Sequence, residues 1–319
     1  MKFSTAASGL FLFISLLSSL AFGTEKVSLA LNWKAEPQFG GFYSTSVNHF
    51  DTANGLTLDV QAGGAGTPVV QMVAAGKFDF GIASADEVII ARARGADVVA
   101  LFAAYQTNPQ AIMTHTERGY KSLADVYSSA SPLAIQKGLP YAMFLEKKFS
   151  GHVTAQVVPY LGGIQNFLAD KTYAQQCFAT SEPLAAEKSG AQVKTFLIAD
   201  EGYNPYTTVL IVRGEVLKKK EALVRAVVAS VRSGWTDYLS NPAPVNARMR
   251  VLNPSMDEAT FKAGAEAQKK LIESSDTKTK AVGTMTAERW TLLRSQLIEM
   301  KLVKADAAKA DVNSYFRNF

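Results

Sequence analysis

Residues 75–87, AGKFDFGIASADE, contain a short apolar run that is followed at once by a polar helix start. The run at 78–82 predicts a buried strand, and the residues that follow the polar segment have helical spacing. Ser84 or Asp86 is placed to cap that helix, and Glu87 would lie in its first turn, where the helix dipole favours a negative charge. The stretch therefore predicts a strand that passes directly into a helix, which is the repeating unit of an α/β fold.

Strand and helix alternate at short spacing on both sides of this unit, so a parallel sheet with crossover helices is the economical architecture. Further strands are predicted at 27–31, 56–61, 97–104, 133–136, 153–159, 177–180 and 193–199. Helical spacing dominates the end of the chain, at 215–238, 243–252, 257–272 and 287–300. Because the pattern restarts after residue 113, we expect an α/β protein of two parallel-sheet lobes with a ligand cleft between them.

The chain is expected to divide into four segments. They are a signal peptide at 1–23, the first part of lobe 1 at 24–110, lobe 2 at 111–202, and the return into lobe 1 with the C-terminal helices at 203–319. The joins between the lobes are expected near 107–113 and 200–213.

The first 23 residues have the layout of a secretory signal peptide. Lys2 supplies a positive start, residues 9–20 are apolar, and the small residues Ala21 and Gly23 precede the expected cleavage site. An apolar helix of this length rises about 18 Å, which is too short for a hydrocarbon core of about 30 Å. We therefore expect the mature protein to be exported, most simply into a periplasm.

The composition excludes several classes of protein. With 48% apolar and 19% charged residues among 319, the chain can bury a large core. Its net charge of +5 is spread out, without the clustered basic and stacking aromatic residues of a nucleic-acid groove. Nucleic acid is therefore not an expected partner.

The residues that carry most catalytic and metal chemistry are sparse. A single cysteine, Cys177, rules out an intramolecular disulfide and a Cys-rich metal site, and we expect it to be buried and inert. His49, His115 and His152 show no metal-ligand spacing, and no G-x-S-x-G motif occurs. The sequence therefore predicts no metal site, no cofactor and no enzymatic activity.

Candidate ligand residues lie where predicted strands end, because open α/β sheets bind ligands there. Trp33 offers a flat face to stack on a ring, although a place in the core is equally open to it. The glycine-rich stretch 63–66 can present backbone N–H groups to a ligand or form only a tight turn. Asp86, Glu87 and Glu182 can accept hydrogen bonds from N–H groups of a ligand or only cap helices.

The return crossing adds Tyr203 and Tyr206, for which hinge packing and ligand contact are both open. The full candidate set for ligand binding is Asn32, Trp33, Glu36, Tyr43, Gly63, Gly64, Ser84, Asp86, Glu87, Gln106, Glu182, Tyr203 and Tyr206. We expect these residues to face the cleft between the lobes.

Taken in order, a series of short motifs resembles the SsuA/THI5-like (NMT1-like) solute-binding proteins. The motifs are LNW at 31–33, GFY at 41–43, the segment 50–56, GGAG at 63–66, AGKFDFG at 75–81, SADE at 84–87, AAYQ at 103–106, SEP at 181–183 and GYNPY at 202–206. The resemblance covers roughly residues 27–239. It implies a two-lobe periplasmic binding protein fold of the type with two crossings between lobes (type II).

The resemblance also implies that the protein delivers a small molecule to the permease of an ABC importer, and we expect it to do so as a monomer. Ligands of the family include pyrimidine precursors of thiamine, riboflavin-like compounds, alkanesulfonates, taurine and nitrate. Many members carry a histidine where this chain has Phe39, and the pyrimidine-making enzymes of the family need that histidine and a Cys-rich stretch. An exported enzyme of that kind is therefore disfavoured.

We expect a binding protein that closes on a small nitrogen heterocycle, a pyrimidine of the thiamine-precursor type or a flavin-like compound. Trp33 and Tyr206 would stack on the ring, and Asp86, Glu87 and Glu182 would accept hydrogen bonds from it. The alternatives are a sulfonate-, taurine- or nitrate-type anion in the same cleft and, less favoured, an exported pyrimidine-processing enzyme.

Overall fold

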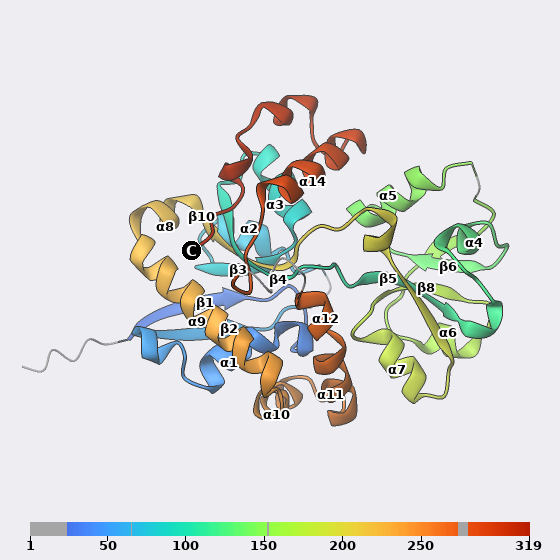
Figure 1. The fold of residues 1–319 in the computed structure, drawn as a ribbon, viewed down its shortest axis with the longest axis horizontal. Helices are drawn as coiled ribbons and strands as arrows, with labels where there is room; N and C mark the ends of the chain where they lie inside the picture. The colour runs from blue at the N-terminus through green and yellow to red at the C-terminus, as the bar shows by residue number, and fades with distance from the viewer. Residues whose placement is uncertain (1–23, 65, 152, 274–279) are drawn as a thin grey trace, which may run out of the picture.

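The structure is a computed structural model that describes residues 24–64, 66–151, 153–273 and 280–319 (Figure 1). The predicted signal peptide, residues 1–23, lies outside the described residues. Among the described residues, no helix is both long and apolar enough to span a membrane. The chain forms two lobes, each built on a five-stranded sheet with flanking helices, so the expected α/β two-lobe fold is confirmed.

The sheet of the first lobe has the strand order β2-β1-β3-β10-β4. Its strands are β1 (Glu25–Ala30), β2 (Leu56–Gln61), β3 (Phe80–Ala83), β4 (Val98–Tyr105) and β10 (Thr207–Arg213). β1 pairs in parallel with β2 and β3, whereas β10 is antiparallel to both of its neighbours. The sheet is mixed rather than wholly parallel because β10 enters it from the other lobe.

Both faces of this sheet are covered, which explains why β10 is apolar at successive positions. Val209 and Ile211 join the apolar core on one face, and Leu210 and Val212 join the core on the other. The first face packs against α2 (Val69–Ala74), α3 (Ala85–Ala93) and α14 (Ala287–Glu299), and the second against α1 (Gly40–Val47) and α9 (Glu221–Ser240).

Two glycines allow α1 and α9 to lie in close contact. A Cβ atom on Gly41 would lie 2.2 Å from ring atoms of Trp235, and one on Gly234 would lie 2.3 Å from the carbonyl oxygen of Gly41. Since real Cβ atoms do not approach other atoms so closely, a side chain at either position would push the helices apart.

We expect Gly234→Ala to lower the free energy of unfolding by about 1–2 kcal/mol, because the cost of overpacking exceeds the gain in helix propensity. Urea denaturation of the purified protein measures the change. Ser233→Ala, at the exposed neighbouring position of the same helix, is the matched control and should change stability little. A Gly234→Ala protein as stable as its parent would show that the two helices are not closely packed.

The sheet of the second lobe has the order β7-β6-β8-β5-β9. Its strands are β5 (Gln110–His115), β6 (Pro132–Ile135), β7 (Gln156–Pro159), β8 (Ala174–Phe178) and β9 (Val193–Leu197). The helices of this lobe are α4 (Leu123–Tyr127), α5 (Pro140–Lys148), α6 (Gln165–Ala169) and α7 (Glu182–Lys188). Cys177, in β8, is buried as expected, and burial raises the pKa of its thiol well above the usual value.

Two strands were not predicted, β5 and β10. Their residues fall in the stretches expected to join the lobes, 107–113 and 200–213, but each forms a full strand between two neighbours. The apolar runs 111–113 and 209–212 are buried in the two sheets. The chain therefore passes between the lobes in short segments, and the antiparallel strands begin or end directly beside them.

The two crossings lie side by side and are joined by hydrogen bonds. The backbone N–H of Asn108, in the first crossing, donates to Oδ1 of Asn204 in the second at 2.8 Å. The side-chain amide of Asn108 donates to the carbonyl of Pro205 at 3.2 Å. The carbonyl of Leu271 accepts the backbone N–H groups of the first crossing at 2.8 and 2.9 Å. The C-terminal segment therefore supports the hinge between the lobes.

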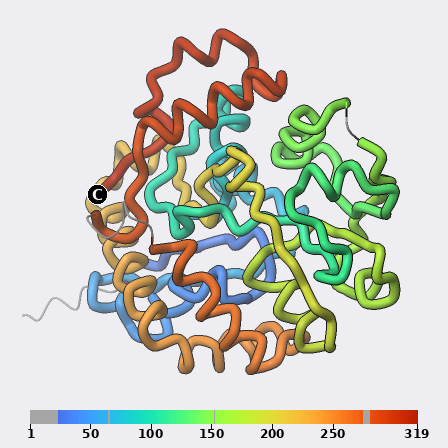
Figure 2. Tube along the Cα trace, turned by 45° about the vertical axis from the view of Figure 1, so that its right-hand side comes forward, coloured from blue at the N-terminus to red at the C-terminus, as the bar shows by residue number. Residues whose placement is uncertain are grey.

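The C-terminal third of the chain, orange to red in Figure 2, wraps the first lobe. Its further helices are α8 (Gly214–Lys219), α10 (Ala243–Leu252), α11 (Glu258–Ala267) and α12 (Lys269–Ile272). The predicted helices 215–238 and 257–272 are each interrupted once, at Lys220 and Gln268. Two exposed ion pairs link the lobes, Lys188 with Asp257 and Lys147 with Glu299.

Candidate functional site

A cavity of about 240 Å³ lies where the two lobes and the two crossings meet. The first lobe lines it with Asn32, Ser84, Asp86, Glu87 and Thr207, and the second with Leu139, Pro140, Tyr141, Phe178 and Ile198. The wall is completed by Gln110, the first residue of β5, and by the crossing residues Asn108, Tyr203 and Pro205. The structure thus brings together these predicted site residues: Asn32, Ser84, Asp86, Glu87 and Tyr203.

The turn from β3 into α3 supplies the carboxylates of the cavity wall. Ser84 is the N-cap of α3 and forms a capping box with Glu87. Oε2 of Glu87 accepts the backbone N–H of Ser84 at 2.8 Å and its hydroxyl at 3.0 Å, so the predicted capping arrangement is present. Within the described part of the chain, Oε1 of Glu87 has no protein donor, which leaves one acceptor of this carboxylate for a ligand.

Asp86 is held by the protein through both of its oxygens. Its Oδ2 accepts the hydroxyl of Tyr203 at 2.7 Å, and its Oδ1 accepts the backbone N–H of Glu87 at 2.9 Å and the hydroxyl of Ser84. Burial and the charge of Asp86 raise the pKa of Tyr203 above the usual value, so the phenol stays protonated and donates. Asp86 therefore orients the turn from which Glu87 presents its remaining oxygen.

The electrostatics of this wall favour a ligand that brings hydrogen-bond donors or positive charge. Glu87 is accessible from the cavity, but protein surrounds most of its carboxylate, and this desolvation, followed by the charge of Asp86, raises the pKa of Glu87. Among the described residues that line the cavity, none is a lysine or an arginine. No group of three or more His, Cys, Asp or Glu side chains in the described ranges is placed to hold a metal ion.

A second pair of carboxyl groups, Glu36 and Glu182, faces across the boundary between the lobes. Glu36 belongs to the first lobe, is 8% exposed, and accepts the indole N–H of Trp33 at 3.1 Å. Glu182, at the start of α7, accepts the hydroxyl of Tyr160 at 3.0 Å and the backbone N–H of Phe178 at 2.8 Å. Burial and then the charge of Glu182 raise the pKa of Glu36 to about 7. Burial also raises the pKa of Glu182.

The folded protein is expected to lose stability as the pH rises from 4.5, the ordinary pKa of Glu36, to about 7, its raised pKa. In this window the folded state keeps a proton that the unfolded state releases, so each increase in pH favours unfolding. Glu36→Gln removes this titration and should therefore weaken the pH dependence of stability. Melting temperatures measured at pH values from 4.5 to about 7 test this. The control is Glu258→Gln, at an exposed position in the first turn of α11. An unchanged pH dependence in Glu36→Gln would contradict the assignment.

Trp33 lies beside this second pair, on the loop after β1, and none of Trp33, Glu36 and Glu182 lines the cavity. Its side chain is 37% exposed, so it is not a core residue. The backbone N–H of Gly63 donates to the carbonyl of Trp33 at 2.9 Å, and that of Gly64 donates to the hydroxyl of Thr67 at 2.9 Å. Gly63 and Gly64 therefore form a turn that supports the tryptophan loop, and neither lines the cavity. Ala65, in the same stretch, lies outside the described residues.

Tyr206 was expected to stack on the ligand, but the structure places it in the packing of the hinge. Its side chain is 2% exposed, and its hydroxyl accepts the backbone N–H of Thr286 at 3.0 Å. The guanidinium carbon of Arg289 lies 3.8 Å from the centre of the ring. Since α14 covers the ring in this way, Tyr206 does not line the cavity.

Tyr43 and Gln106 also lie away from the cavity. Tyr43 is buried in the apolar core between the first sheet and the helices on its second face. Gln106 donates its side-chain amide to the carbonyls of Ala103 and Thr284 at 3.2 and 3.3 Å, and so fixes the start of the first crossing. Neither residue lines the cavity.

Several residues that line the cavity were not predicted from the sequence, among them Asn108, Gln110, Tyr141 and Phe178. Tyr141 is in the first turn of α5, and its hydroxyl donates to Oε1 of Gln176 at 2.5 Å. A signal for it existed, because Pro140 begins the next helix after the predicted strand at 133–136. Asn108, in the first crossing, and Gln110, at the start of β5, carried no such local signal.

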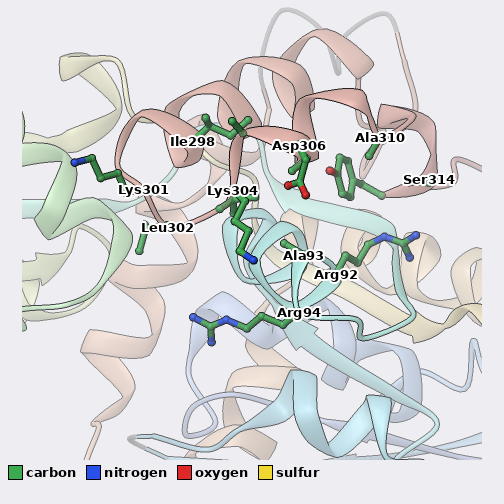
Figure 3. Close-up of a pocket in the computed structure, with 14 residues that line it drawn as sticks. Arg92, Ala93, Arg94, Ile298, Lys301, Leu302, Lys304, Asp306, Ala310 and Ser314 are labelled. Atoms are coloured by element: carbon green, nitrogen blue, oxygen red, sulfur yellow. The ribbon is translucent and has the colours of Figure 1, made fainter.

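A larger hollow, an open groove of about 880 Å³, lies at the other end of α3, beside the segment that follows α14 (Figure 3). Arg92, Arg94, Lys301 and Lys304 line it, and Arg92 pairs with Asp97 at 3.2 Å. Basic side chains at this end suit the negative end of the α3 dipole. None of the predicted site residues lines the groove, so we place the candidate ligand site in the cavity between the lobes.

A family model described as NMT1/THI5 like matches residues 36–244 of the sequence. A search of curated protein sequences finds no match. The family match covers both sheets of the structure except β1, and it includes the turn at Ser84 and the start of α7 at Glu182.

Solved structures with a similar fold include binding proteins and an enzyme. The periplasmic aliphatic sulphonate binding protein SsuA from Escherichia coli is 14% identical, with a TM-score of 0.66 over 91% of each chain. The alkanesulfonate-binding protein SsuA from Xanthomonas axonopodis pv. citri, bound to MOPS, is 12% identical, with a TM-score of 0.62 over 92% of this chain and 98% of that one. The desulfurization enzyme DSZB is 14% identical, with a TM-score of 0.57 over 90% and 98%. These likenesses confirm the periplasmic binding protein fold.

Proposed function

The chain belongs to the NMT1/THI5-like family, and from that membership we propose that it is the solute-binding protein of an ABC importer, with a pyrimidine of the thiamine-precursor type as its ligand. The observation that carries the proposal is the cavity between the lobes, which carboxylates line and which no described lysine or arginine lines. Closure of the two lobes around a ligand excludes water and strengthens each hydrogen bond made there.

The acceptors of the cavity support a ligand with amino or ring N–H groups. Oε1 of Glu87 is the acceptor without a protein donor among the described residues, and a charge-assisted hydrogen bond to it would fix the orientation of an aminopyrimidine. Trp33 does not line the cavity itself, but from the loop that carries Asn32 it would offer its exposed ring to a heterocycle bound there. Glu182 would then act from the second lobe, through the acidic pair that it forms with Glu36.

The volume of the cavity favours a single ring over a flavin. A space of about 240 Å³ is below the usual range of about 300–1,000 Å³ for pockets that hold drug-sized ligands. A substituted pyrimidine fits such a space, whereas the three fused rings of a flavin need a larger one. The proposal therefore selects the pyrimidine from the two heterocycles considered.

An anion of the sulfonate type is the second candidate. Two observations favour it: the neighbours named SsuA, and the N-terminal ends of α3 and α5, whose residues line the cavity. Asp86 and Glu87 oppose it, because an anionic ligand beside two carboxylates would be repelled at short range.

Isothermal titration of the purified protein with 4-amino-5-hydroxymethyl-2-methylpyrimidine, riboflavin and taurine tests the proposal. We expect the pyrimidine to bind with one-to-one stoichiometry, and taurine and riboflavin not to bind. Mass spectrometry should recover the pyrimidine unchanged after incubation. Binding of taurine in place of the pyrimidine would establish the anion alternative, and steady conversion of the pyrimidine would establish the enzyme alternative.

A further inference from the structure

Tyr203, in the second crossing between the lobes, contacts both of them. It lies between the 3-10 helix Ile198–Glu201 and β10, and its side chain is 1% exposed. The phenol hydroxyl contacts the first lobe, where it donates to Asp86 at 2.7 Å. The ring contacts the second lobe, where it stacks on Phe144 of α5 with centroids 5.2 Å apart and an interplanar angle of 28°.

Further contacts fix the crossing on either side of this residue. Lys148, at the end of α5, pairs with the carboxylate of Glu201 at 2.5 Å and donates to its carbonyl at 2.7 Å. From α14 of the first lobe, the side-chain amide of Gln296 donates to the carbonyl of Gly202 at 2.8 Å. A movement of α5 relative to the first lobe must therefore move the Tyr203 ring or break these contacts.

A continuous chain of hydrogen bonds leads from Tyr203 to the oxygen left for a ligand. Asp86 accepts from Tyr203 through Oδ2, and through Oδ1 it accepts the backbone N–H of Glu87. The hydroxyl of Ser84 lies within hydrogen-bond distance of Asp86 Oδ1 and Glu87 Oε2, and these two acceptors share its single proton. Because Asp86 and Glu87 are adjacent in the first turn of α3, a change in the orientation of one alters the position of the other.

We propose that Tyr203 is a positioning residue that couples the angle between the lobes to the Ser84–Glu87 turn, so that the turn takes its ligand-binding arrangement only when Phe144 holds the phenol ring. The coupling links α5, which lines the cavity through Pro140 and Tyr141, to the carboxylates on the opposite wall. This coupling would regulate ligand binding in the same cavity. Of the two measurements below, only the affinity measurement rests on the proposed function.

Two conservative variants separate the two contacts of this residue. Tyr203→Phe removes the hydroxyl and keeps the ring that stacks on Phe144. Phe144→Leu removes the stacked ring and keeps an apolar side chain in α5. Tyr238→Phe is the matched control, because Tyr238 is equally buried and donates to Oδ1 of Asn246 at 2.6 Å, in the first lobe between α9 and α10.

The first measurement is hydrogen exchange at the backbone amide of Glu87, which donates to Asp86, and it needs no ligand. We expect this amide to exchange several-fold faster in Tyr203→Phe and in Phe144→Leu than in the parent, and at the parent's rate in Tyr238→Phe. If Phe144→Leu leaves this rate unchanged, the second lobe does not act on the turn and the proposal is overturned.

The second measurement is affinity for 4-amino-5-hydroxymethyl-2-methylpyrimidine. We expect Tyr203→Phe to weaken binding about tenfold, as for the loss of a hydrogen bond to a charged acceptor, and Tyr238→Phe to leave it unchanged. In a double-mutant cycle, Tyr203→Phe should have no further effect once Asp86 is replaced by alanine. Additive effects would overturn the proposal. If the parent does not bind the pyrimidine, the proposed ligand is wrong, and the exchange measurement alone decides the coupling.

Discussion

Replacement of Glu87 by glutamine is expected to weaken binding of the pyrimidine by about 1.5–3 kcal/mol, or about 10- to 150-fold in Kd, with a loss of folding stability of about 1 kcal/mol or less. The carboxylate has two oxygens, and the capping box uses one of them. Glutamine can cap Ser84 with its single oxygen, but it then turns an NH₂ group toward the N–H donor of the ligand. Isothermal titration and thermal melting of the same preparation measure the two quantities.

Asp125→Asn is the matched control for this variant. Asp125 closes a capping box with Ser122 at the start of α4, where it accepts the backbone N–H groups of Lys121 at 2.6 Å and Ser122 at 3.0 Å. It does not line the cavity, so its replacement should cost capping energy and leave binding unchanged. If Glu87→Gln, Asp86→Asn and Glu182→Gln all bind the ligand as the parent does, the acidic site is wrong. An anion held at the N-terminal ends of α3 and α5 then becomes the better account.

Trp33→Ala is expected to weaken binding by about 1–3 kcal/mol while the melting temperature stays close to that of the parent. The ring is 37% exposed, and its N–H donates to Glu36 at 3.1 Å, which fixes its orientation on the loop that carries Asn32 into the cavity wall. Truncation removes the ring face without leaving a cavity in either core.

Trp33→Phe distinguishes the ring from its N–H group. Phenylalanine cannot donate to Glu36, but it keeps an aromatic face. Trp33→Phe should therefore retain most of the affinity that Trp33→Ala loses. Unchanged affinity of Trp33→Ala together with a lower melting temperature would show that the tryptophan serves the fold and not the ligand.

The part of the site that local sequence determines was predictable. The turn at 84–87 has an apolar strand before it and a capping residue at its start, so the strand, the helix and the capping box follow from neighbouring residues. Asn32 follows the end of β1 and lines the cavity for the reason that strand ends in α/β sheets do, and Tyr203 lies in the return crossing that the sequence predicts.

The rest depends on contacts between distant parts of the chain. Tyr206 has the same sequence context as Tyr203, but Arg289 and α14 cover its ring, and no local pattern indicates that contact. Asn108 lines the cavity because the two crossings pair with each other through Asn204. The strands β5 and β10 were interpreted as connections because they lie where the chain changes lobes, although their apolar runs are typical of buried strands.

The position of β10 in the first sheet also sets an order for the folding of the two lobes. Every strand of the second sheet lies between residues 110 and 197, whereas β3 and β4 become joined only through β10, which ends at residue 213. As the chain emerges N-terminus first, the facing edges of β3 and β4 therefore stay unpaired until the whole second lobe has followed, and pairing over such a sequence separation is slow. The second lobe can reach its native state first, and a chaperone that holds the emerging chain would find its main binding sites at the unpaired edges of β3 and β4.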